Sequence, residues 1–461
     1  MAGKRVITVT APEGGLAGAL RAIPSKSQAH RALICAALSG KPSRVVCADP
    51  SDDILATAAC LRALGAGVAY GAGVFEVTPI PRVSGHDAQR QPPLDLYCGE
   101  SGTTLRLLLP IVAALGRSAR FHRAGRLAQR PLSPLYEELA AHGCRLGPPS
   151  AEPLTLSGRL EPGRFHLNGG VSSQFISGLL FALPLLAGPS ELCLTGALQS
   201  RPYVDMTLSA LRGSGVEVMS GDAAFSCAGP QAYRVPDEVV VEGDWSNAAF
   251  WLCAGALSAR SVTVTGLDPA SRQGDRGVID ILRRFGARVE VAQDQVRVRG
   301  GRALLRGIEI DARDIPDLAP VLAVVGAAAS GQTTITGAGR LRLKESDRLA
   351  ATCDVLGRLG ARIQVTDDGL EMCGAQQLVA ATVDAWGDHR IAMTAAIASL
   401  LCADPVTITG ADAVNKSYPR FFEDFEALGG QARADSFARV DKQSRCARPA
   451  KQGAGRKGIS L

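Results

Sequence analysis

LRALGAGV (61–68) combines an apolar helix end, a glycine and the start of an apolar strand, and this pattern recurs five more times. Glycine just past a helix end adopts the left-handed backbone conformation that other residues resist. Each copy therefore predicts a helix that stops at glycine, followed by a strand. The further copies are LAAHGCRL (139–146), LRGSGVEV (211–218), LRRFGARV (282–289), LGRLGARI (356–363) and FEALGGQA (425–432).

The six glycines lie 69–78 residues apart, at nearly constant spacing. Such spacing predicts six similar α/β units, divided most simply into two domains of three. A chain of 461 residues, 46% of them hydrophobic, has ample material for two packed cores. The sixth copy ends near Asp435, so we expect the folded part to end there.

The net charge of +6 lies in the C-terminal tail rather than in the body of the chain. From Ser436 to Leu461 there are seven basic residues, and Asp441 is the only acidic one. The tail is rich in Gly, Ala, Lys and Arg and lacks apolar periodicity, so we predict that it is disordered. The body is balanced in charge, which argues against nucleic acid as a partner.

Cysteine usage and hydropathy indicate a cytoplasmic protein. The 12 cysteines form no CxxC pair, and most stand in apolar runs, which predicts buried reduced thiols rather than disulfides or a metal site. The N-terminal MAGKRVITVT lacks the apolar core of a signal peptide. The longest apolar runs, such as 318–329, are too short to cross a bilayer, so we expect no membrane partner.

Four segments of the first half place cations, hydroxyls or amides beside an expected helix start or a proline-pinned loop. Free N–H groups at a helix start, next to a cation and a hydroxyl, form an anion site. Taken singly, 24–38 suits an ordinary amphipathic helix equally well, and 125–135 is more typical of a surface loop. The glycine pair of 98–110 is a moderate signal, and a plain N-cap explains only one of the three polar groups in 169–180. The segments are PSKSQAHRALICAAL (24–38) with Lys26, Ser27 and Arg31, CGESGTTLRLLLP (98–110) with Gly102, GRLAQRPLSPL (125–135) with Arg130, and GGVSSQFISGLL (169–180) with Ser172, Ser173 and Gln174.

Four segments of the second half carry carboxylates, cations or both. A carboxylate at a helix start is commonly stabilised by the helix dipole, and a charged string is commonly a solvated surface. The sharper hypothesis is that Asp317 and Glu345 transfer protons. The segments are DIPDLAPVLAVVGAA (314–328), LRLKESDRLA (341–350) with Lys344 and Arg348, WGDHRIAMTAAIA (386–398) with Arg390, and NKSYPRFF (415–422) with Lys416.

Together these eight segments resemble the 5-enolpyruvylshikimate-3-phosphate synthase (3-phosphoshikimate 1-carboxyvinyltransferase) family, in order from about Ile7 to about Asp435. The resemblance implies an α/β fold of two similar globular domains, each of three βαβαββ repeats, an inside-out α/β barrel. One domain would comprise residues 1–20 and 244–435 and carry the acidic catalytic segments. The other would comprise 21–243 and carry most of the acceptor site, and 436–461 would be the tail.

The resemblance also implies a role for each matching residue. Asp317, Glu345 and Lys26 would be catalytic, with Asp317 taking the proton of the acceptor's 5-hydroxyl and Glu345 handling the proton at the methylene carbon. Shikimate 3-phosphate would be bound by Lys26, Ser27, Arg31, Ser172, Ser173, Gln174, Ser200, Arg201, Asp317 and Lys344. Phosphoenolpyruvate would be bound by Lys26, Gly102, Arg130, Gln174, Arg348, Arg390 and Lys416.

The implied reaction transfers an enolpyruvyl group from phosphoenolpyruvate to shikimate 3-phosphate and releases phosphate. Two carboxylates and a cationic cage suffice for this addition–elimination, so we expect no metal and no organic cofactor, and we expect a monomer. The alternative is the related transferase that acts on UDP-N-acetylglucosamine. That enzyme usually has Lys-Asn near its N-terminus and a loop cysteine, whereas here Ser27 follows Lys26 and residues 123–134 contain no cysteine.

Two departures from the family pattern affect the expected site. Glu100 stands in GESGT, where many members have asparagine. Arg340 stands four residues before Lys344, where an asparagine is often found and would contact the acceptor.

Overall fold

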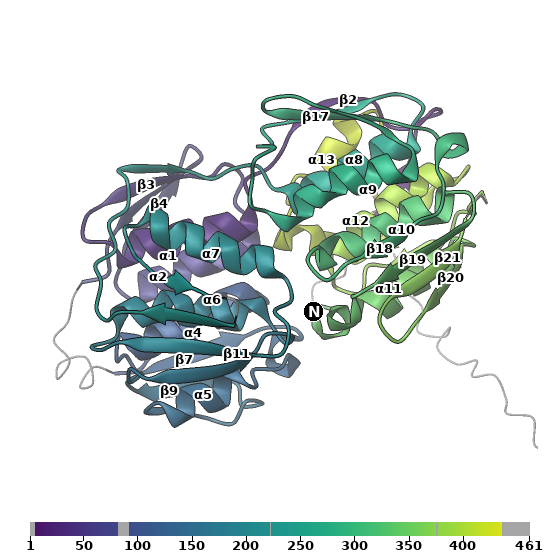
Figure 1. Cartoon of the computed structure of the whole chain (residues 1–461). Coiled ribbons are helices and arrows are strands. Elements are labelled where there is room, and N and C mark those ends of the chain that lie inside the picture. The colour runs from purple at the N-terminus through teal and green to yellow at the C-terminus, as the bar shows by residue number, and fades with distance from the viewer. Residues whose placement is uncertain (1–4, 82–91, 222, 375–376, 436–461) are drawn as a thin grey trace, which may run out of the picture.

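The computed structural model describes residues 5–81, 92–221, 223–374 and 377–435, and the predicted disordered tail lies outside them. Within these residues the chain forms two lobes (Figure 1). We use the name inserted lobe for the described residues from 25 to 243 and the name terminal lobe for the described residues of 5–24 and 244–435. Each has a hydrophobic core of its own, with Ala29 to Val241 in one core and Ile7 to Ile23 plus Trp245 to Leu428 in the other.

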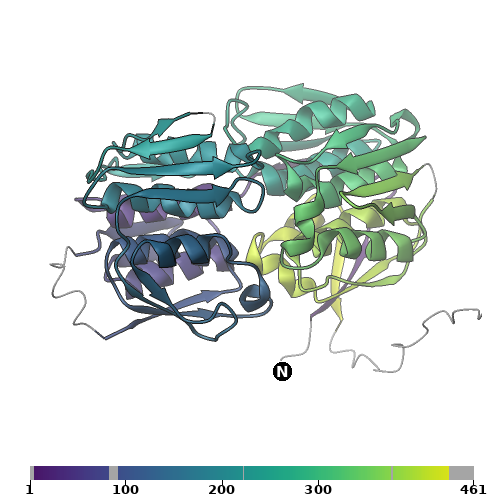
Figure 2. The ribbon, with the colours of Figure 1, turned by 60° about the horizontal axis from the view of Figure 1, so that its bottom comes forward.

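Six four-stranded sheets share one topology. In each sheet a parallel pair of strands is extended by two antiparallel strands, as in the order β6-β7-β9-β8. Three of the units read strand, helix, strand, helix and two strands along the chain. In the other three, a strand distant in sequence completes the sheet, namely β1 (Val6–Thr10), β2 (Gly18–Arg21) or β14 (Glu238–Val240). The described residues thus confirm the predicted α/β fold of repeated units. Strands lie toward the outside of each lobe and helices between them (Figure 2).

The inserted lobe contains three of the six units. Its helices are α1 (Lys26–Leu38), α2 (Asp52–Ala63), α4 (Gly102–Ala114), η1 (Leu127–Gln129), α5 (Leu135–Ala141), α6 (Ser173–Ala182), η2 (Leu183–Leu185) and α7 (Arg201–Gly213). Its strands are β3 (Ser43–Val46), β4 (Gly67–Gly71), β5 (Val74–Thr78), β6 (Leu94–Gly99), β7 (Ala119–Arg123), β8 (Cys144–Leu146), β9 (Leu154–Gly158), β10 (Arg164–Asn168), β11 (Ser190–Thr195), β12 (Met219–Ser220), β13 (Ala224–Cys227) and β14 (Glu238–Val240).

The terminal lobe contains the other three. Its helices are α8 (Trp245–Leu257), η3 (Gly274–Gly277), α9 (Val278–Phe285), η4 (Arg302–Leu304), η5 (Pro316–Leu318), α10 (Ala319–Ala328), η6 (Gly339–Leu343), α11 (Arg348–Arg358), α12 (His389–Ala398), η7 (Ser399–Leu401), η8 (Ala411–Lys416) and α13 (Phe421–Ala427). Its strands are β1 (Val6–Thr10), β2 (Gly18–Arg21), β15 (Val262–Thr265), β16 (Arg288–Val291), β17 (Gln295–Arg299), β18 (Glu309–Asp311), β19 (Gln332–Thr336), β20 (Arg362–Val365), β21 (Leu370–Cys373), β22 (Thr382–Asp384), β23 (Val406–Thr409) and β24 (Gln431–Asp435).

The repeated glycines end helices as the sequence predicts. All six have a positive φ, between 69° and 103°. Each lies after the end of a helix and before the strand that follows it. A side chain at these positions would be strained, so the pattern is a backbone requirement.

The first helix of each unit is its more buried helix. Nearly every residue of α4, α8, α10 and α12 is buried, as expected of a helix that is apolar all round. Of these helices, α4, α10 and α12 begin within polar segments identified above, as α1 does at Lys26 and α6 at Ser173. The fold therefore supplies a set of helix N-termini, with free N–H groups and positive dipole ends.

The chain crosses between the lobes twice, at neighbouring points. Asp244 N–H donates to the Ile23 carbonyl at 2.8 Å, and Ser25 N–H donates to the Glu242 carbonyl at 2.8 Å. Leu20 and Ile23 pack in the terminal core, and Val241 packs in the inserted core. The domain boundaries drawn at 20/21 and 243/244 stay a prediction.

Two further observations concern the described residues only. Their eleven cysteines are all free, and most are buried, although Cys373 is exposed. No helix among them combines the length and apolar character needed to span a bilayer.

Candidate active site

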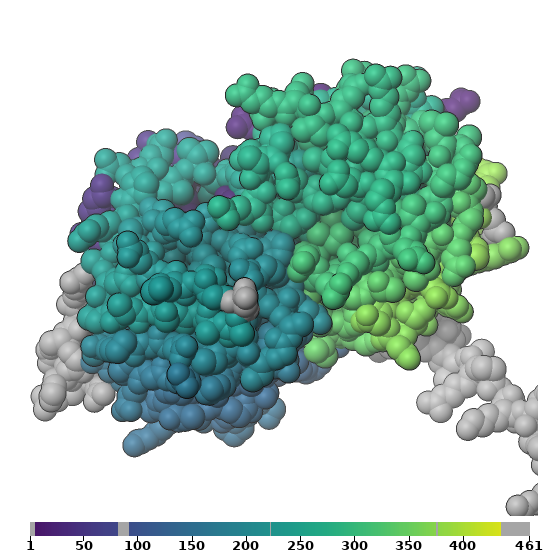
Figure 3. Space-filling view, in the orientation of Figure 1, coloured from purple at the N-terminus to yellow at the C-terminus, as the bar shows by residue number. Residues whose placement is uncertain are grey.

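Two small cavities open between the lobes and share Tyr203 and Asp317. The larger has a volume of about 80 Å³ and the smaller about 20 Å³. The lobes are in contact over the middle of the face seen in Figure 3. The larger cavity is lined by Arg106, Arg130, Pro131, Val171, Ser172, Ser173, Gln174, Phe175, Ser200, Tyr203, Asp317, Arg340, Leu343 and Lys344. The smaller is lined by Lys26, Ser27, Tyr203, Met206, Asp244, Ser246, Gln273, Gly274, Asp275, Asp317 and Arg390.

Lys26 stands at the first position of α1 and faces the smaller cavity. Ser25 caps the helix, because its hydroxyl accepts from Gln28 N–H. The Lys26 ammonium pairs with the Asp53 carboxylate at 2.9 Å, and its backbone N–H donates to Asp244 at 3.0 Å. Lys26 is therefore held by both lobes at the point where the chain crosses between them.

Two predicted acceptor-binding arginines line neither cavity. Arg31 is buried between α1 and α7, where its guanidinium donates to the Ser27 and Tyr203 carbonyls and to the Thr207 hydroxyl. Burial lowers the pKa of Arg31 to about 10. Arg201 is part-exposed and pairs with Asp205 at 3.1 Å along α7. In this structure both arginines therefore bind protein groups.

The start of α6 brings all three predicted polar residues to the larger cavity. Ser172 is the N-cap and accepts from Gln174 N–H, which leaves Ser173 and the Gln174 side chain for other contacts. The Gln174 amide accepts from Arg106 at 2.9 Å and donates to Thr103 at 2.9 Å. Sequence reasoning did not assign Arg106 to the site, although it stands in the segment already singled out.

Gly102, at the start of α4, lies under two guanidinium groups. A Cβ at this position would come within 2.7 Å of Arg130 Nη1 and 2.8 Å of Arg106 Nη1. Burial, and next the charge of Arg130, lower the pKa of Arg106 well below its usual range. Two like charges held this close make a strong anion site. Only glycine lets both guanidinium groups approach the N-terminus of this helix.

Asp317 is surrounded by cations of its own lobe. Its carboxylate pairs with Arg348 at 2.8 Å, with Arg390 at 3.4 Å and with Lys344 at 3.8 Å. Burial opposes ionisation of this carboxyl, but Lys344, Arg390 and Arg348 outweigh it and hold the pKa of Asp317 far below its usual range. Burial lowers the pKa of Lys344 to about 8, against the opposing attraction of Asp317.

Glu345 joins the two lobes. One carboxylate oxygen lies 3.2 Å from Arg130 of the inserted lobe and the other 2.8 Å from Arg348 of the terminal lobe. Burial favours the protonated form, yet Arg130 and Arg348 lower the pKa of Glu345 well below its usual value. The predicted proton carrier is thus ionised and lies between two predicted phosphoenolpyruvate ligands.

Asp388 fixes the arginines around Asp317. It caps α12 by accepting from Arg390 N–H at 2.9 Å and accepts from Arg348 Nε at 2.8 Å. The Arg390 guanidinium donates to the Ser246 carbonyl and hydroxyl. His389 is buried beside them, and burial followed by the charges of Lys26 and Arg348 lowers its pKa well below the usual range. The imidazole is therefore neutral.

Arg340 reaches the site from the terminal lobe. Its guanidinium donates to the Ser200 hydroxyl and to the Arg313 carbonyl, each at 2.9 Å. Ser200 has φ 54°, a left-handed conformation that is uncommon outside glycine, and it precedes the first residue of α7. This departure from the family pattern adds a cation to the larger cavity.

Tyr203 and Asp275 are site residues that sequence reasoning missed. The Tyr203 hydroxyl lies 3.3 Å from an Asp275 oxygen and 3.4 Å from an Asp317 oxygen. The other Asp275 oxygen is buried and has no hydrogen-bond partner. Burial, and next the charge of Asp317, raise the pKa of Asp275 to about 7. Only the GD pair within RQGDRG (272–277) could have pointed to a helix-start carboxylate here.

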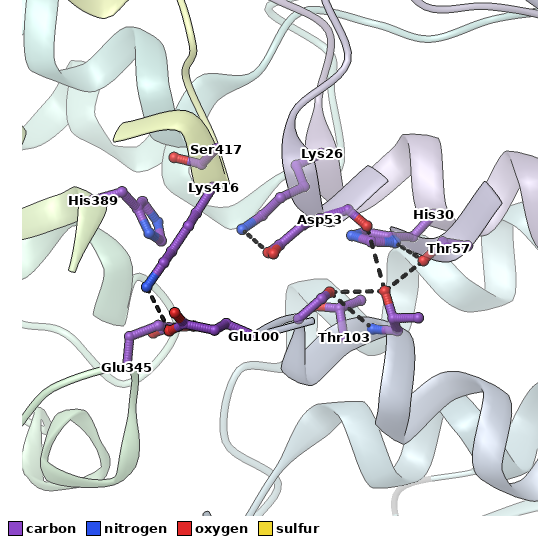
Figure 4. Close-up of polar contacts among 12 residues, drawn as sticks. Lys26, His30, Asp53, Thr57, Glu100, Thr103, Glu345, His389, Lys416 and Ser417 are labelled. Carbon is purple, nitrogen blue, oxygen red and sulfur yellow. Dashed lines mark hydrogen bonds and ion pairs between the residues drawn. The ribbon is translucent and has the colours of Figure 1, made fainter. Parts of the chain in front are cut away.

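Lys416 contacts the inserted lobe at Glu100, and neither residue lines the two cavities. Its ammonium lies 2.6 Å from the Glu100 carboxylate and 2.6 Å from the Gly387 carbonyl. Figure 4 shows Lys416 reaching down to Glu100, with His389 and Glu345 near it and the Lys26–Asp53 pair across the gap. Among the residues the structure describes, no three His, Cys, Asp or Glu side chains are grouped so as to hold a metal ion.

Sequence comparison places this geometry among known proteins. Residues 10–425 match the family described as EPSP synthase (3-phosphoshikimate 1-carboxyvinyltransferase). The chain is 40% identical over 418 residues to the 3-phosphoshikimate 1-carboxyvinyltransferase of Clostridium kluyveri, which covers 90% of this chain and 96% of that relative. It is 41% identical over 424 residues to the enzyme of the same name from Clostridioides difficile, with the same coverage.

Structural comparison agrees on the fold. An EPSP synthase from Acinetobacter baumannii superposes with a TM-score of 0.76 at 24% identity, over 93% of this chain and all of that one. The enolpyruvyl transferase NikO from Streptomyces tendae superposes with a TM-score of 0.73 at 22% identity, over 95% of this chain and all of that one.

Proposed function

The chain belongs to the EPSP synthase family, and we propose that the cleft between its lobes is where it transfers the enolpyruvyl group of phosphoenolpyruvate to the 5-hydroxyl of shikimate 3-phosphate. The chain is thus a transferase of the shikimate pathway, which leads to aromatic amino acids. The observation that carries the assignment to this cleft is the ring of cations around Asp317 and Glu345, contributed by both lobes.

The larger cavity suits the phosphate and ring of shikimate 3-phosphate. Ser172, Ser173 and Gln174 offer hydroxyls and an amide at a helix N-terminus, and Lys344 and Arg340 add positive charge. Ser200 would reach the same phosphate from the start of α7. Lys26 and Ser27 line the smaller cavity, where the acceptor's remaining groups would lie.

Phosphoenolpyruvate would lie between Arg130 and the terminal-lobe cations. A carboxylate and a phosphate on one small molecule need several fixed cations, and Arg130, Arg348, Arg390 and Lys416 supply them. Gly102 would let the phosphate approach the N–H groups that open α4.

The proposed reaction is an addition followed by an elimination. Asp317 accepts the proton of the 5-hydroxyl as that oxygen attacks C2 of phosphoenolpyruvate, while a proton is added at C3 through Glu345. The tetrahedral intermediate then loses phosphate and, at C3, one proton. Neither the addition nor the elimination requires a metal ion or an organic cofactor.

The low pKa values of the two carboxyls are consistent with these roles once anions are bound. The same cations that hold Asp317 and Glu345 ionised would be neutralised in part by the phosphate and carboxylate of the substrates. Less positive charge raises the pKa of a neighbouring carboxyl. Substrate binding would thereby bring both groups closer to the range in which they exchange protons.

Phosphate release tests the assignment and separates it from the alternative acceptor. The wild type should release phosphate from phosphoenolpyruvate with shikimate 3-phosphate and not with UDP-N-acetylglucosamine. Asp317→Ala should lower turnover by about 10²–10⁴-fold, the usual contribution of a general base. Asp280→Asn, an exposed carboxylate of the same lobe, should leave it unchanged. Absence of turnover in the wild type would refute the assignment.

We also propose that the enzyme acts as a cytoplasmic monomer on its two small-molecule substrates, without nucleic acid or membrane. All the proposed substrate ligands come from one chain, which supports a monomer. The charge balance of the body supports the absence of a polyanionic partner.

A further inference from the structure

Glu100 places a negative charge where the proposed function needs positive charge. It lies between β6 and the Ser101 cap of α4, on the inserted lobe, and its carboxylate accepts from Lys416 at 2.6 Å. Lys416 is one of the four cations proposed above to bind phosphoenolpyruvate. Many family members have an uncharged asparagine where this chain has Glu100.

The carboxylate of Glu100 packs against the backbone of Gly125. Gly125, with φ 54°, lies directly beneath it, and a Cβ there would come within 2.5 Å of Glu100 Cδ. The Lys416 side chain is 16% exposed and that of Glu100 37%. The pair is thus partly withdrawn from water, where an opposite charge attracts more strongly than in bulk solvent.

Lys416 cannot offer its full charge to a substrate anion while Glu100 accepts from it. Its ammonium has three donors, of which Glu100 and the Gly387 carbonyl take two. A phosphate or carboxylate arriving at Lys416 must either displace Glu100 or bind beside a like charge. Both choices cost affinity.

We propose that Glu100 sets the affinity for phosphoenolpyruvate by competing with it for Lys416. This inference rests on the proposed role of Lys416. Other proposed ligands also have carboxylate partners, such as Asp53 for Lys26 and Glu345 for Arg130, and Glu345 is itself a proposed proton carrier. Glu100 has no proposed role in proton transfer, so removing its charge should leave the chemistry intact.

The test compares Glu100→Gln with the wild type in phosphate-release kinetics at saturating shikimate 3-phosphate. KM for phosphoenolpyruvate should fall about three-fold, the scale of a partly exposed ion pair, with kcat and KM for shikimate 3-phosphate unchanged. Glu100→Asp keeps the negative charge, so its KM for phosphoenolpyruvate should stay closer to the wild-type value than that of Glu100→Gln. An unchanged or raised KM for phosphoenolpyruvate in Glu100→Gln would overturn the proposal.

A matched control uses a second ion pair between the lobes, away from the two cavities. Asp49 and Arg420 lie 3.0 Å apart with half-exposed side chains. Asp49→Asn should leave KM for phosphoenolpyruvate unchanged. If it lowers KM as Glu100→Gln does, the effect comes from loosening the contact between lobes, and the competition proposal is wrong.

A double-mutant cycle locates the effect at Lys416. In a Lys416→Gln background, Glu100→Gln should produce no further change in KM. An equal fall in that background would contradict the proposal. If turnover of Lys416→Gln is too slow to measure, protection against thermal unfolding by phosphoenolpyruvate with shikimate 3-phosphate gives the same comparison. Failure of the proposed function would be distinct, because the wild type itself would then release no phosphate.

Discussion

The two lobes are built from the same unit but present different chemistry to the cleft. The inserted lobe offers mainly cations, hydroxyls and an amide, as at Arg130, Ser173 and Gln174. The terminal lobe offers carboxylates interlocked with arginines, as at Asp317 and Arg348. The shared fold supplies helix N-termini on both sides. Both lobes supply proposed substrate ligands, whereas the two proposed proton-transfer residues, Asp317 and Glu345, belong to the terminal lobe alone.

This difference between the lobes predicts that substitutions in them affect different kinetic constants. Residues of the inserted lobe that only hold an anion should change KM. Residues of the terminal lobe that move protons should change kcat, since they act on the reacting atoms.

Glu345→Gln should lower kcat by about 10²–10⁴-fold, because an amide cannot exchange the proton at the methylene carbon. Its shape keeps hydrogen bonds to Arg130 and Arg348 possible, so KM for phosphoenolpyruvate should change much less. Steady-state phosphate release gives both constants. Glu290→Gln, an exposed residue of the same lobe, is the control. A change confined to KM would show that Glu345 only binds substrate, and it would contradict the proposed role in proton transfer.

Asp275→Asn should alter how stability depends on pH. Because the pKa of Asp275 is raised to about 7, its protonated form stabilises the fold at low pH, and this contribution is lost as pH rises from about 4 through 7. The loss is bounded at about 4 kcal/mol, since each pKa unit is worth about 1.4 kcal/mol. From pH 5 to pH 8, the free energy of unfolding measured with urea should fall more in the wild type than in Asp275→Asn. Parallel losses in both proteins would show that Asp275 does not titrate there.

Gly102→Ala should raise KM for phosphoenolpyruvate about ten-fold, the cost of one displaced charged hydrogen bond. The new methyl group would push the Arg130 and Arg106 guanidinium groups away from the start of α4. Gly40→Ala, where a Cβ meets nothing within 4 Å, is the control. Kinetics with each substrate varied in turn would test this, and a fall in kcat at unchanged KM would contradict a purely binding role.

Deletion of residues 436–461 should change neither kcat nor KM, although it removes the whole excess of positive charge. The charged groups of the cleft all lie in the body. The same phosphate-release assay at two salt concentrations would reveal any contribution of the tail, and a marked rise in KM for either substrate would overturn this expectation.

Much of the architecture follows from the sequence because it depends on local rules. The six glycines and the polar helix starts are short patterns, and each has one backbone solution. Lys26, Gly102 and Ser172 therefore stand at helix starts or caps as expected.

Side-chain direction was less accessible to sequence reasoning. Arg31 follows Lys26 by five residues, which turns it about 140° around α1. It therefore packs against α7 rather than lining either cavity. Tyr203 and Asp275 were missed because their meeting with Asp317 joins three segments that are distant in the sequence. No local pattern marks such a contact.

The crossing of the chain between lobes has a consequence for the order of synthesis. β1 pairs with both β23 and β24, and β2 pairs with β15, so the first strands to be made belong to sheets completed by much later ones. The inserted lobe is contiguous and has all its strands once β14 has left the ribosome. The terminal lobe cannot close until the last residues of the fold emerge. During translation, the N-terminal strands must therefore wait beside a finished lobe for partners that do not yet exist.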